Sequence, residues 1–144
     1  MVRLRFLAAV VLAMVSFGPI ALASAQLDAS DGTAIRSVIE KQIEAFRRDD
    51  GEGAFAFAAP SIRAMFGTAA AFMEMVRNSY RSVYRPANVE FEDLSESGGV
   101  VAQRVHVVGP DGKPRTALFI MERQQDGSWR IAGCMLLDEP GRST

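Results

Sequence analysis

The hydrophobic pattern of this chain changes at Arg85-Pro86, and this change limits the possible folds more than any other feature. Before Pro86, apolar residues recur at the spacing of amphipathic helices, and after it they recur at the two-residue spacing of strands. A residue that precedes proline is pushed towards extended geometry, so a helix should end here. Helices followed by a run of strands predict an α+β domain, with the helices packed on one face of a sheet.

Four extended runs follow this boundary, and three short turn signals separate them. The turns contain Ser97-Gly98-Gly99, Pro110-Asp111-Gly112 and Asp126-Gly127. Short connections with glycine at positive φ join antiparallel neighbours, so the runs are predicted to form a four-stranded antiparallel meander. The four runs are Asn88–Ser95, Val100–Val108, Arg115–Gln124 and Trp129–Leu137.

The N-terminal half predicts three helices. The first begins near Ile35, with Thr33 as its N-cap, and its apolar stripe runs to Phe46. Asp50 is expected to cap the next helix, because carboxylates are unfavourable at a helix C-terminus. The other two helices are predicted over Glu52–Ala58 and Ala69–Tyr80, with a single helical turn between Pro60-Ser61 and Gly67.

The first 25 residues have the layout of a secretory signal peptide. Arg3 and Arg5 precede an uncharged apolar run, Gly18-Pro19 interrupts it, and the small residues Ala23-Ser24-Ala25 precede Gln26. This layout predicts an exported protein, periplasmic or extracellular, that is cleaved between Ala25 and Gln26. The alternative is an uncleaved N-terminal membrane anchor, because the uncharged run is long enough to span a bilayer.

The rest of the chain is predicted to form one domain. Residues 26–33 are expected to be a flexible leader, residues 34–140 a single α+β domain, and residues 141–144 a tail. The sequence has one cysteine, Cys134, so no intramolecular disulfide can form and core packing must hold the fold. The 16 Lys+Arg and 17 Asp+Glu residues form no basic stripe, so neither nucleic acid nor, after cleavage, a membrane is an expected partner.

Three strand segments are apolar on both faces, which is unusual for a sheet with one wet face. They are Val105–Val108, Ala117–Met121 and Cys134–Leu137. A second copy of the chain is the simplest cover for the second apolar face, so a homodimer is expected. The alternative is a strongly curved sheet that closes on itself.

A set of residues spread over nearly the whole domain carries a resemblance to a known family. The set comprises Gln42, Ala45-Phe46, Asp50-Gly51, Ala54–Ile62, Phe72-Met73, Met75–Arg77, Val83–Pro86, Met121-Glu122, Gly127–Ile131 and Gly133-Cys134. With these residues the chain resembles the domain of unknown function 4864 family, which has the nuclear transport factor two-like fold, or cystatin-like cone. The resemblance implies three helices in the hollow of a curved four-stranded antiparallel sheet. It implies no catalytic residues, and the wider fold includes isomerases, dehydratases and binding modules.

Arg63, Tyr80, Tyr84 and His106 are the candidate ligand-pocket residues. The resemblance implies a pocket at the open end of the cone. Tyr80 and Tyr84 share a side if their helix continues that far, and each offers an apolar wall with a hydroxyl. Arg63 could anchor an acidic ligand, and His106, the single histidine, could act as a pocket base. The alternative is that these residues only pack at the rim or on the strand.

Glu122 is a weak candidate for a buried catalytic acid, and its role depends on which side of the third strand faces the hollow. If Leu118 and Ile120 point inward, Glu122 points the same way. If their neighbours Phe119 and Met121 point inward, Glu122 is a surface residue. No metal or cofactor is expected, because one histidine and one cysteine cannot make the usual zinc ligand sets.

Three functions are compatible with these patterns. The leading hypothesis is an exported module that binds a hydrophobic or weakly acidic small molecule in a cone-shaped pocket. An isomerase or dehydratase that uses Glu122 and the Tyr84 hydroxyl is the first alternative. A protein-interaction domain that dimerises through its sheet is the second.

Overall fold

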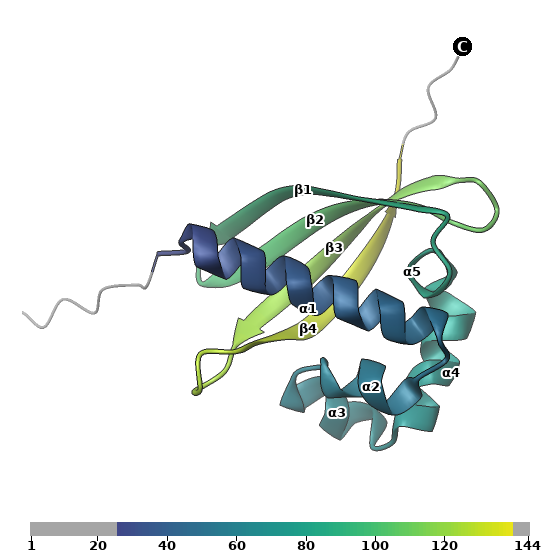
Figure 1. Cartoon of the computed structure of the whole chain (residues 1–144), viewed down its shortest axis with the longest axis horizontal. Helices are drawn as coiled ribbons and strands as arrows, with labels where there is room; N and C mark the ends of the chain where they lie inside the picture. The colour runs from purple at the N-terminus through teal and green to yellow at the C-terminus, as the bar shows by residue number, and fades with distance from the viewer. Residues whose placement is uncertain (1–25, 140–144) are drawn as a thin grey trace, which may run out of the picture.

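The computed structural model describes residues 26–139, which form helices followed by strands (Figure 1). The elements are α1 (Ala29–Arg47), α2 (Gly51–Ala56), α3 (Pro60–Phe66), α4 (Ala69–Ser79), α5 (Arg81–Tyr84), β1 (Asn88–Ser97), β2 (Val100–Val108), β3 (Pro114–Arg123) and β4 (Trp129–Asp138). The expected signal peptide over residues 1–25, its cleavage site after Ala25 and the expected tail over residues 141–144 lie outside the described residues.

The four strands form one antiparallel sheet in the order β1-β2-β3-β4, which confirms the predicted meander. The three turns use the glycines that the sequence singles out, because Gly98, Gly99, Gly112 and Gly127 all have positive φ. Irregular pairing interrupts β1 after Phe91 and the β3–β4 ladder after Ile120. Such bulges increase strand bending, and the sheet is curved.

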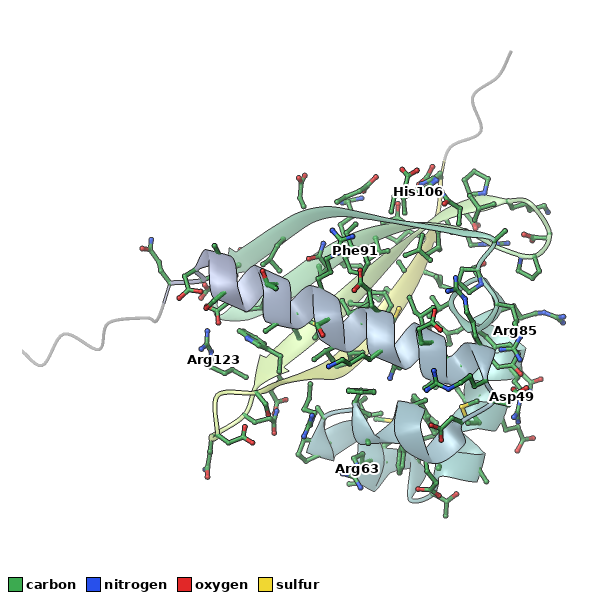
Figure 2. The ribbon with its side chains drawn as sticks, in the orientation of Figure 1. Asp49, Arg63, Arg85, Phe91, His106 and Arg123 are labelled. Carbon is green, nitrogen blue, oxygen red and sulfur yellow. The ribbon has the colours of Figure 1, made fainter. Side chains whose placement is uncertain are left out.

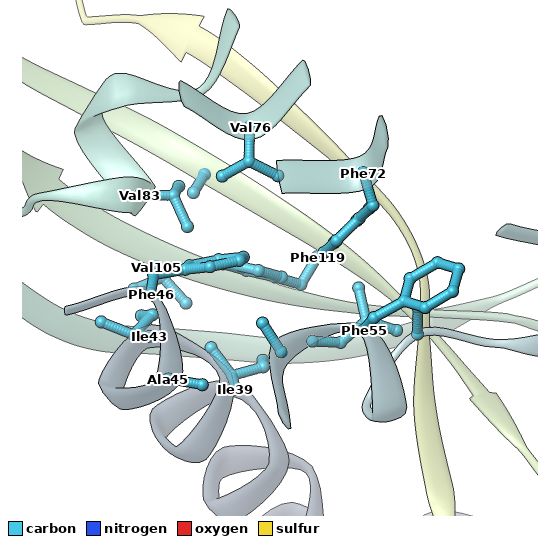
Figure 3. Close-up of a cluster of buried hydrophobic side chains, with 14 of the residues drawn as sticks. Ile39, Ile43, Ala45, Phe46, Phe55, Phe72, Val76, Val83, Val105 and Phe119 are labelled. Carbon is cyan, nitrogen blue, oxygen red and sulfur yellow. The ribbon is translucent and has the colours of Figure 1, made fainter. Parts of the chain in front are cut away.

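The helices fill the concave side of the sheet. Figure 1 shows α1 running across this face, with α2, α3 and α4 gathered beside its C-terminal half. Ile39 of α1 and Val105 of β2 are fully buried, and Phe119 of β3 is 1% exposed (Figure 3). The expected architecture, with helices packed in the hollow of a curved antiparallel sheet, is therefore confirmed.

The first helix begins earlier than the sequence predicts, so the expected leader over residues 26–33 is wrong from Ala29 onward. Asp28, not Thr33, is the N-cap. The Asp28 carboxylate accepts from the Asp31 N–H at 2.9 Å, and the Asp31 carboxylate accepts from the Asp28 N–H at 3.0 Å. This reciprocal capping box satisfies two helix-end donors, which favours the early start. Thr33 lies inside the helix, where its hydroxyl donates to the Ala29 carbonyl.

The helix after Gly67 ends one residue earlier than predicted. Helix α4 ends at Ser79, and Tyr80 has non-helical dihedral angles (φ −128°, ψ 41°) before the short helix α5. The chain changes direction here, so Tyr80 and Tyr84 do not share a helix face. Asp50 does cap α2 as predicted, with its carboxylate accepting from the Gly53 N–H at 2.9 Å.

The two faces of the sheet differ in what covers them. Inner-face residues such as Val107 and Ala117 are fully buried under the helices. On the outer face, Met135 and Leu137 are 49% and 45% exposed.

Among residues 26–139, no helix has both the length and the apolar character needed to cross a membrane.

Candidate functional site

A cavity of about 440 Å³ lies between the sheet and helices α3 and α4. Its walls are mostly apolar, and they come from helices α1, α3 and α4 and from strands β3 and β4. Ligand pockets commonly measure about 300–1,000 Å³, so the cavity suits a small organic molecule. Its main apolar lining residues are Ile62, Phe66, Phe72, Val76, Phe119 and Ile131.

Helix α3 forms one wall of the cavity and packs loosely against the rest of the domain. None of its residues is buried, and no side chain caps its N-terminus, where Pro60 occupies the first turn. Ile62 and Phe66 are partly buried against the core, while Met65 is 73% exposed at the cavity mouth. Gly67 ends the helix with φ +75°, a conformation that glycine adopts without strain. The cavity therefore lies beneath a short helix that packs only lightly on the domain.

The connection between α2 and α3 is fixed to the edge strand β4. The Ala59 N–H donates to the Ile131 carbonyl, and the Ile131 N–H donates to the Phe57 carbonyl, both at 2.8 Å. These two backbone hydrogen bonds hold the entry to α3 in place, although α3 itself contributes little to the core. The same strand contributes Ile131, Gly133 and Cys134 to the cavity wall.

Few polar groups reach the cavity. Gln42 of α1 is 4% exposed, and its Nε2 donates to the Ala54 carbonyl at 3.1 Å. The Tyr80 hydroxyl donates to the Cys134 carbonyl at 2.9 Å, and burial raises the pKa of Tyr80 above its ordinary value. Burial among apolar neighbours also raises the pKa of the Cys134 thiol to about 12, so it is protonated at neutral pH. Cys134 therefore behaves as a small apolar residue in the cavity wall.

No charged side chain lines the cavity among the described residues. The cavity can therefore exclude water and surround an apolar molecule, but its walls offer no ionised acid or base. The described residues also contain no cluster of three or more His, Cys, Asp or Glu side chains suited to a metal ion.

The structure brings only one of the four candidate pocket residues to the cavity. Tyr80 lies in the wall. Arg63 lies outside it, with its guanidinium 5.4 Å from the centre of the Phe55 ring. Figure 2 shows Arg63 and His106 at opposite sides of the molecule.

The other two candidate residues have structural partners elsewhere. The Tyr84 hydroxyl donates to the Asp49 carboxylate, and the Arg85 guanidinium lies over the Tyr84 ring at 4.0 Å. His106 lies on the sheet beside the end of β4, where its Nδ1 is 2.7 Å from a Glu139 carboxylate oxygen. Neither Tyr84 nor His106 lines this cavity.

Glu122 is a surface residue, which is the second of the two arrangements that the sequence allows, so it is not a buried acid. Phe119 and Met121 are the inward residues of β3, so the alternation of the strand turns Glu122 outward. Its carboxylate accepts from the exposed Gln124 amide at 3.2 Å. The next inward position, Arg123, forms an ion pair of 2.7 Å with Asp31.

Sequence reasoning missed Gln42 as a cavity residue. The available signal was its position, since it falls on the apolar stripe of α1 between Ile39, Ile43 and Phe46. A polar residue on a buried helix face needs a partner, which Ala54 supplies. The structure thus defines a small α+β domain with an apolar cavity under a curved sheet.

The chain belongs to the family described as domain of unknown function DUF4864, which matches residues 28–144. The resemblance stated from the sequence is thereby confirmed at the family level. The chain is also similar to a solved structure titled as an NTF-2 like protein of unknown function from Burkholderia xenovorans LB400. The two share 14% identity with a TM-score of 0.46, over 78% of this chain and 89% of that one. No curated protein matches the chain.

Proposed function

We propose that this domain binds a hydrophobic small molecule in the cavity beneath α3 and α4. The observation that carries the proposal is the cavity of about 440 Å³. Its lining is mostly apolar, and among the described residues it includes no charged side chain. Apolar concave sites with a few polar groups are the usual form of small-molecule sites. A weakly acidic ligand fits the same walls only in its uncharged form, because Arg63 lies outside the lining. Catalysis is not part of the proposal, since Glu122 is exposed.

Thermal unfolding in the presence of probe molecules tests this proposal. A ligand that binds only the folded state stabilises it by about 2.7 kcal/mol at a hundredfold excess over Kd. We expect 2-naphthol and naphthalene to raise the Tm by several degrees and the anion 2-naphthoate to leave it unchanged. The proposal fails if none of the uncharged probes raises the Tm.

A matched pair of variants on α3 locates the binding. Ile62 lines the cavity and is partly buried, whereas Ala64 on the same helix is exposed. Ile62→Trp should fill the mouth of the cavity and reduce the probe-induced shift, and Ala64→Trp should leave the shift unchanged. Equal shifts in both variants would place binding elsewhere.

We also propose that the protein is exported and released. The support is the sequence over residues 1–25, where a charged start, an apolar run and Ala23-Ser24-Ala25 precede Gln26. Intact mass measurement on protein expressed in a bacterial host should find an N-terminus at Gln26 in the periplasm or medium, and Ala25→Leu should retain the precursor. Uncleaved protein confined to the membrane fraction would instead support the anchor.

A further inference from the structure

Gln42 is the only polar residue among the buried residues of α1 outside its capping box. Its side chain is 4% exposed and lines the cavity. The Ala54 carbonyl, 3.1 Å from its Nε2, can only accept a hydrogen bond. The amide orientation is thereby fixed, with Nε2 at Ala54 and Oε1 directed elsewhere.

The Gln42 Oε1 atom has no hydrogen-bond partner among residues 26–139. Side-chain hydrogen bonds of the described residues include the Nε2 bond to Ala54 and none to Oε1. Among the same residues, no fully enclosed side-chain nitrogen or oxygen lacks a partner. Oε1 therefore retains accessible surface, and the side chain that carries it lines the cavity. An acceptor in apolar surroundings gains from any donor brought to it.

Tyr80, a second polar residue of the cavity wall, also offers a hydrogen-bond acceptor. The hydrogen of the Tyr80 hydroxyl is committed to the Cys134 carbonyl at 2.9 Å. What this hydroxyl can offer a ligand is an oxygen lone pair. The hydroxyl of Ser79 can donate or accept, but Ser79 is exposed at the rim.

We propose that the cavity selects an uncharged, mostly apolar molecule that carries one hydroxyl or N–H donor, and that Gln42 Oε1 accepts the hydrogen bond from it. This inference rests on the proposed function of the cavity and names the class of ligand. A carboxylate is excluded because it would bring a third acceptor to a wall without a cation among the described residues. A pure hydrocarbon would bind, but it would leave Oε1 without a partner.

Three probes of one ring system separate these possibilities. 2-Naphthol donates a hydrogen bond, 2-methoxynaphthalene has the oxygen without the hydrogen, and naphthalene has neither. Dissociation constants from NMR chemical-shift titration of the full protein should show 2-naphthol binding about tenfold more tightly than the other two. 2-Methoxynaphthalene serves as a control for the other end of the amide. The second N–H of Gln42 could donate to a ligand oxygen, and this ether offers an oxygen acceptor without a donor.

A variant pair then assigns the preference to Gln42. Gln42→Met replaces the amide with an apolar side chain of similar length, and Lys41→Met makes the same replacement at the exposed neighbouring position. Gln42→Met should reduce the preference for 2-naphthol to less than twofold, whereas Lys41→Met should keep it. The ratio in the unmodified protein remains decisive even if Gln42→Met does not fold.

The outcomes distinguish the two proposals. If no probe binds, the cavity proposal and the present inference both fail. If naphthalene or 2-methoxynaphthalene binds as tightly as 2-naphthol, the cavity proposal stands and the donor requirement is overturned. A preference that survives in folded Gln42→Met also overturns the role of Gln42.

Discussion

Asp49 joins the end of α1 to the segments that follow α3. It is the only non-glycine residue with positive φ (53°) among the described residues. Its carboxylate accepts a hydrogen bond from Tyr84 and forms ion pairs with Arg85 at 2.9 Å and Arg77 at 3.6 Å. Figure 2 shows Asp49 beside Arg85. A short polar side chain tolerates this left-handed conformation better than most others. One residue therefore combines a backbone turn with contacts to α4, α5 and the residue that follows α5.

Substitution of Asp49 should separate these two roles. Asp49→Ala loses both the carboxylate and a side chain that favours positive φ, and we expect it to lower the Tm by several degrees. Asp49→Asn keeps the conformational preference and one acceptor oxygen, so it should lower the Tm less. Thermal unfolding followed by circular dichroism measures both variants, and an equal loss in the two would contradict the conformational argument.

The same carboxylate makes stability depend on pH. The hydrogen bond from Tyr84 and the nearby guanidinium groups of Arg85 and Arg77 hold the pKa of Asp49 below its ordinary value of 3.8. A carboxyl whose pKa is lowered on folding stabilises the protein above the unfolded value, and this contribution is lost as the pH falls through the folded pKa. The Tm should therefore decrease below about pH 3.8, and the decrease should be smaller in Asp49→Asn. An equal decrease in that variant would assign the pH dependence to other carboxylates.

The interruption between α4 and α5 places Tyr80 where it can hold the edge strand. Its hydroxyl donates to the carbonyl of Cys134 in β4, a strand with a sheet neighbour on only one side. Tyr80→Phe keeps the ring in the cavity wall and removes this one hydrogen bond. We expect the free energy of unfolding in urea to fall by about 0.5–1.5 kcal/mol. An unchanged free energy of unfolding would mean that water replaces the Tyr80 hydroxyl as the partner of the Cys134 carbonyl.

The elements differ in how readily the sequence reveals them. The strands follow from their turn glycines, whose positive φ the structure confirms at positions such as Gly112 and Gly127. The start of α1 is harder to predict from the sequence, because Asp31 completes the capping box where glutamate or glutamine is the usual residue. The inward face of β3 also stays ambiguous, because both Phe119 and its neighbour Ile120 are apolar and alternation carries no signal.

The candidate site was harder to predict than the fold. Tyr80 reaches the cavity because the helix breaks beside it, a local event that helical spacing does not encode. Arg63 and His106 have suitable chemistry, but a cation–π contact with Phe55 and a hydrogen bond between His106 and Glu139 hold them elsewhere. Gln42 has no catalytic chemistry, and its importance emerges only once the cavity beside it is known.

For the molecule as a whole, the outer face of the sheet remains to be explained. It carries the apolar side chains of Leu118, Ile120, Met135 and Leu137, the last two about half exposed. Charges of both signs lie on the same face, since Glu122 is paired with Arg130 across β3 and β4. A face with apolar groups and both charges is suited to a copy of itself, so we propose that a second copy covers it.

Light scattering on the purified protein tests this dimer. The unmodified protein should have the mass of a dimer at micromolar concentration. Met135→Glu should yield a monomer, because a charge would be buried in the interface. Met65→Glu makes the same change at an exposed position on α3 and should remain dimeric. A monomeric unmodified protein would rule out the dimer under these conditions.

The position of Cys134 gives the cavity a chemical reporter of its own. The thiol is the only one in the sequence, it lies in the cavity wall, and burial raises its pKa to about 12. Since only the thiolate reacts with maleimides at an appreciable rate, labelling of the folded protein should be slow and should measure how often the wall opens. Bound 2-naphthol should slow it further, and labelling as fast as in denaturant would contradict this view. A compound in a crude extract that protects Cys134 would thus reveal itself as a ligand before its identity is known.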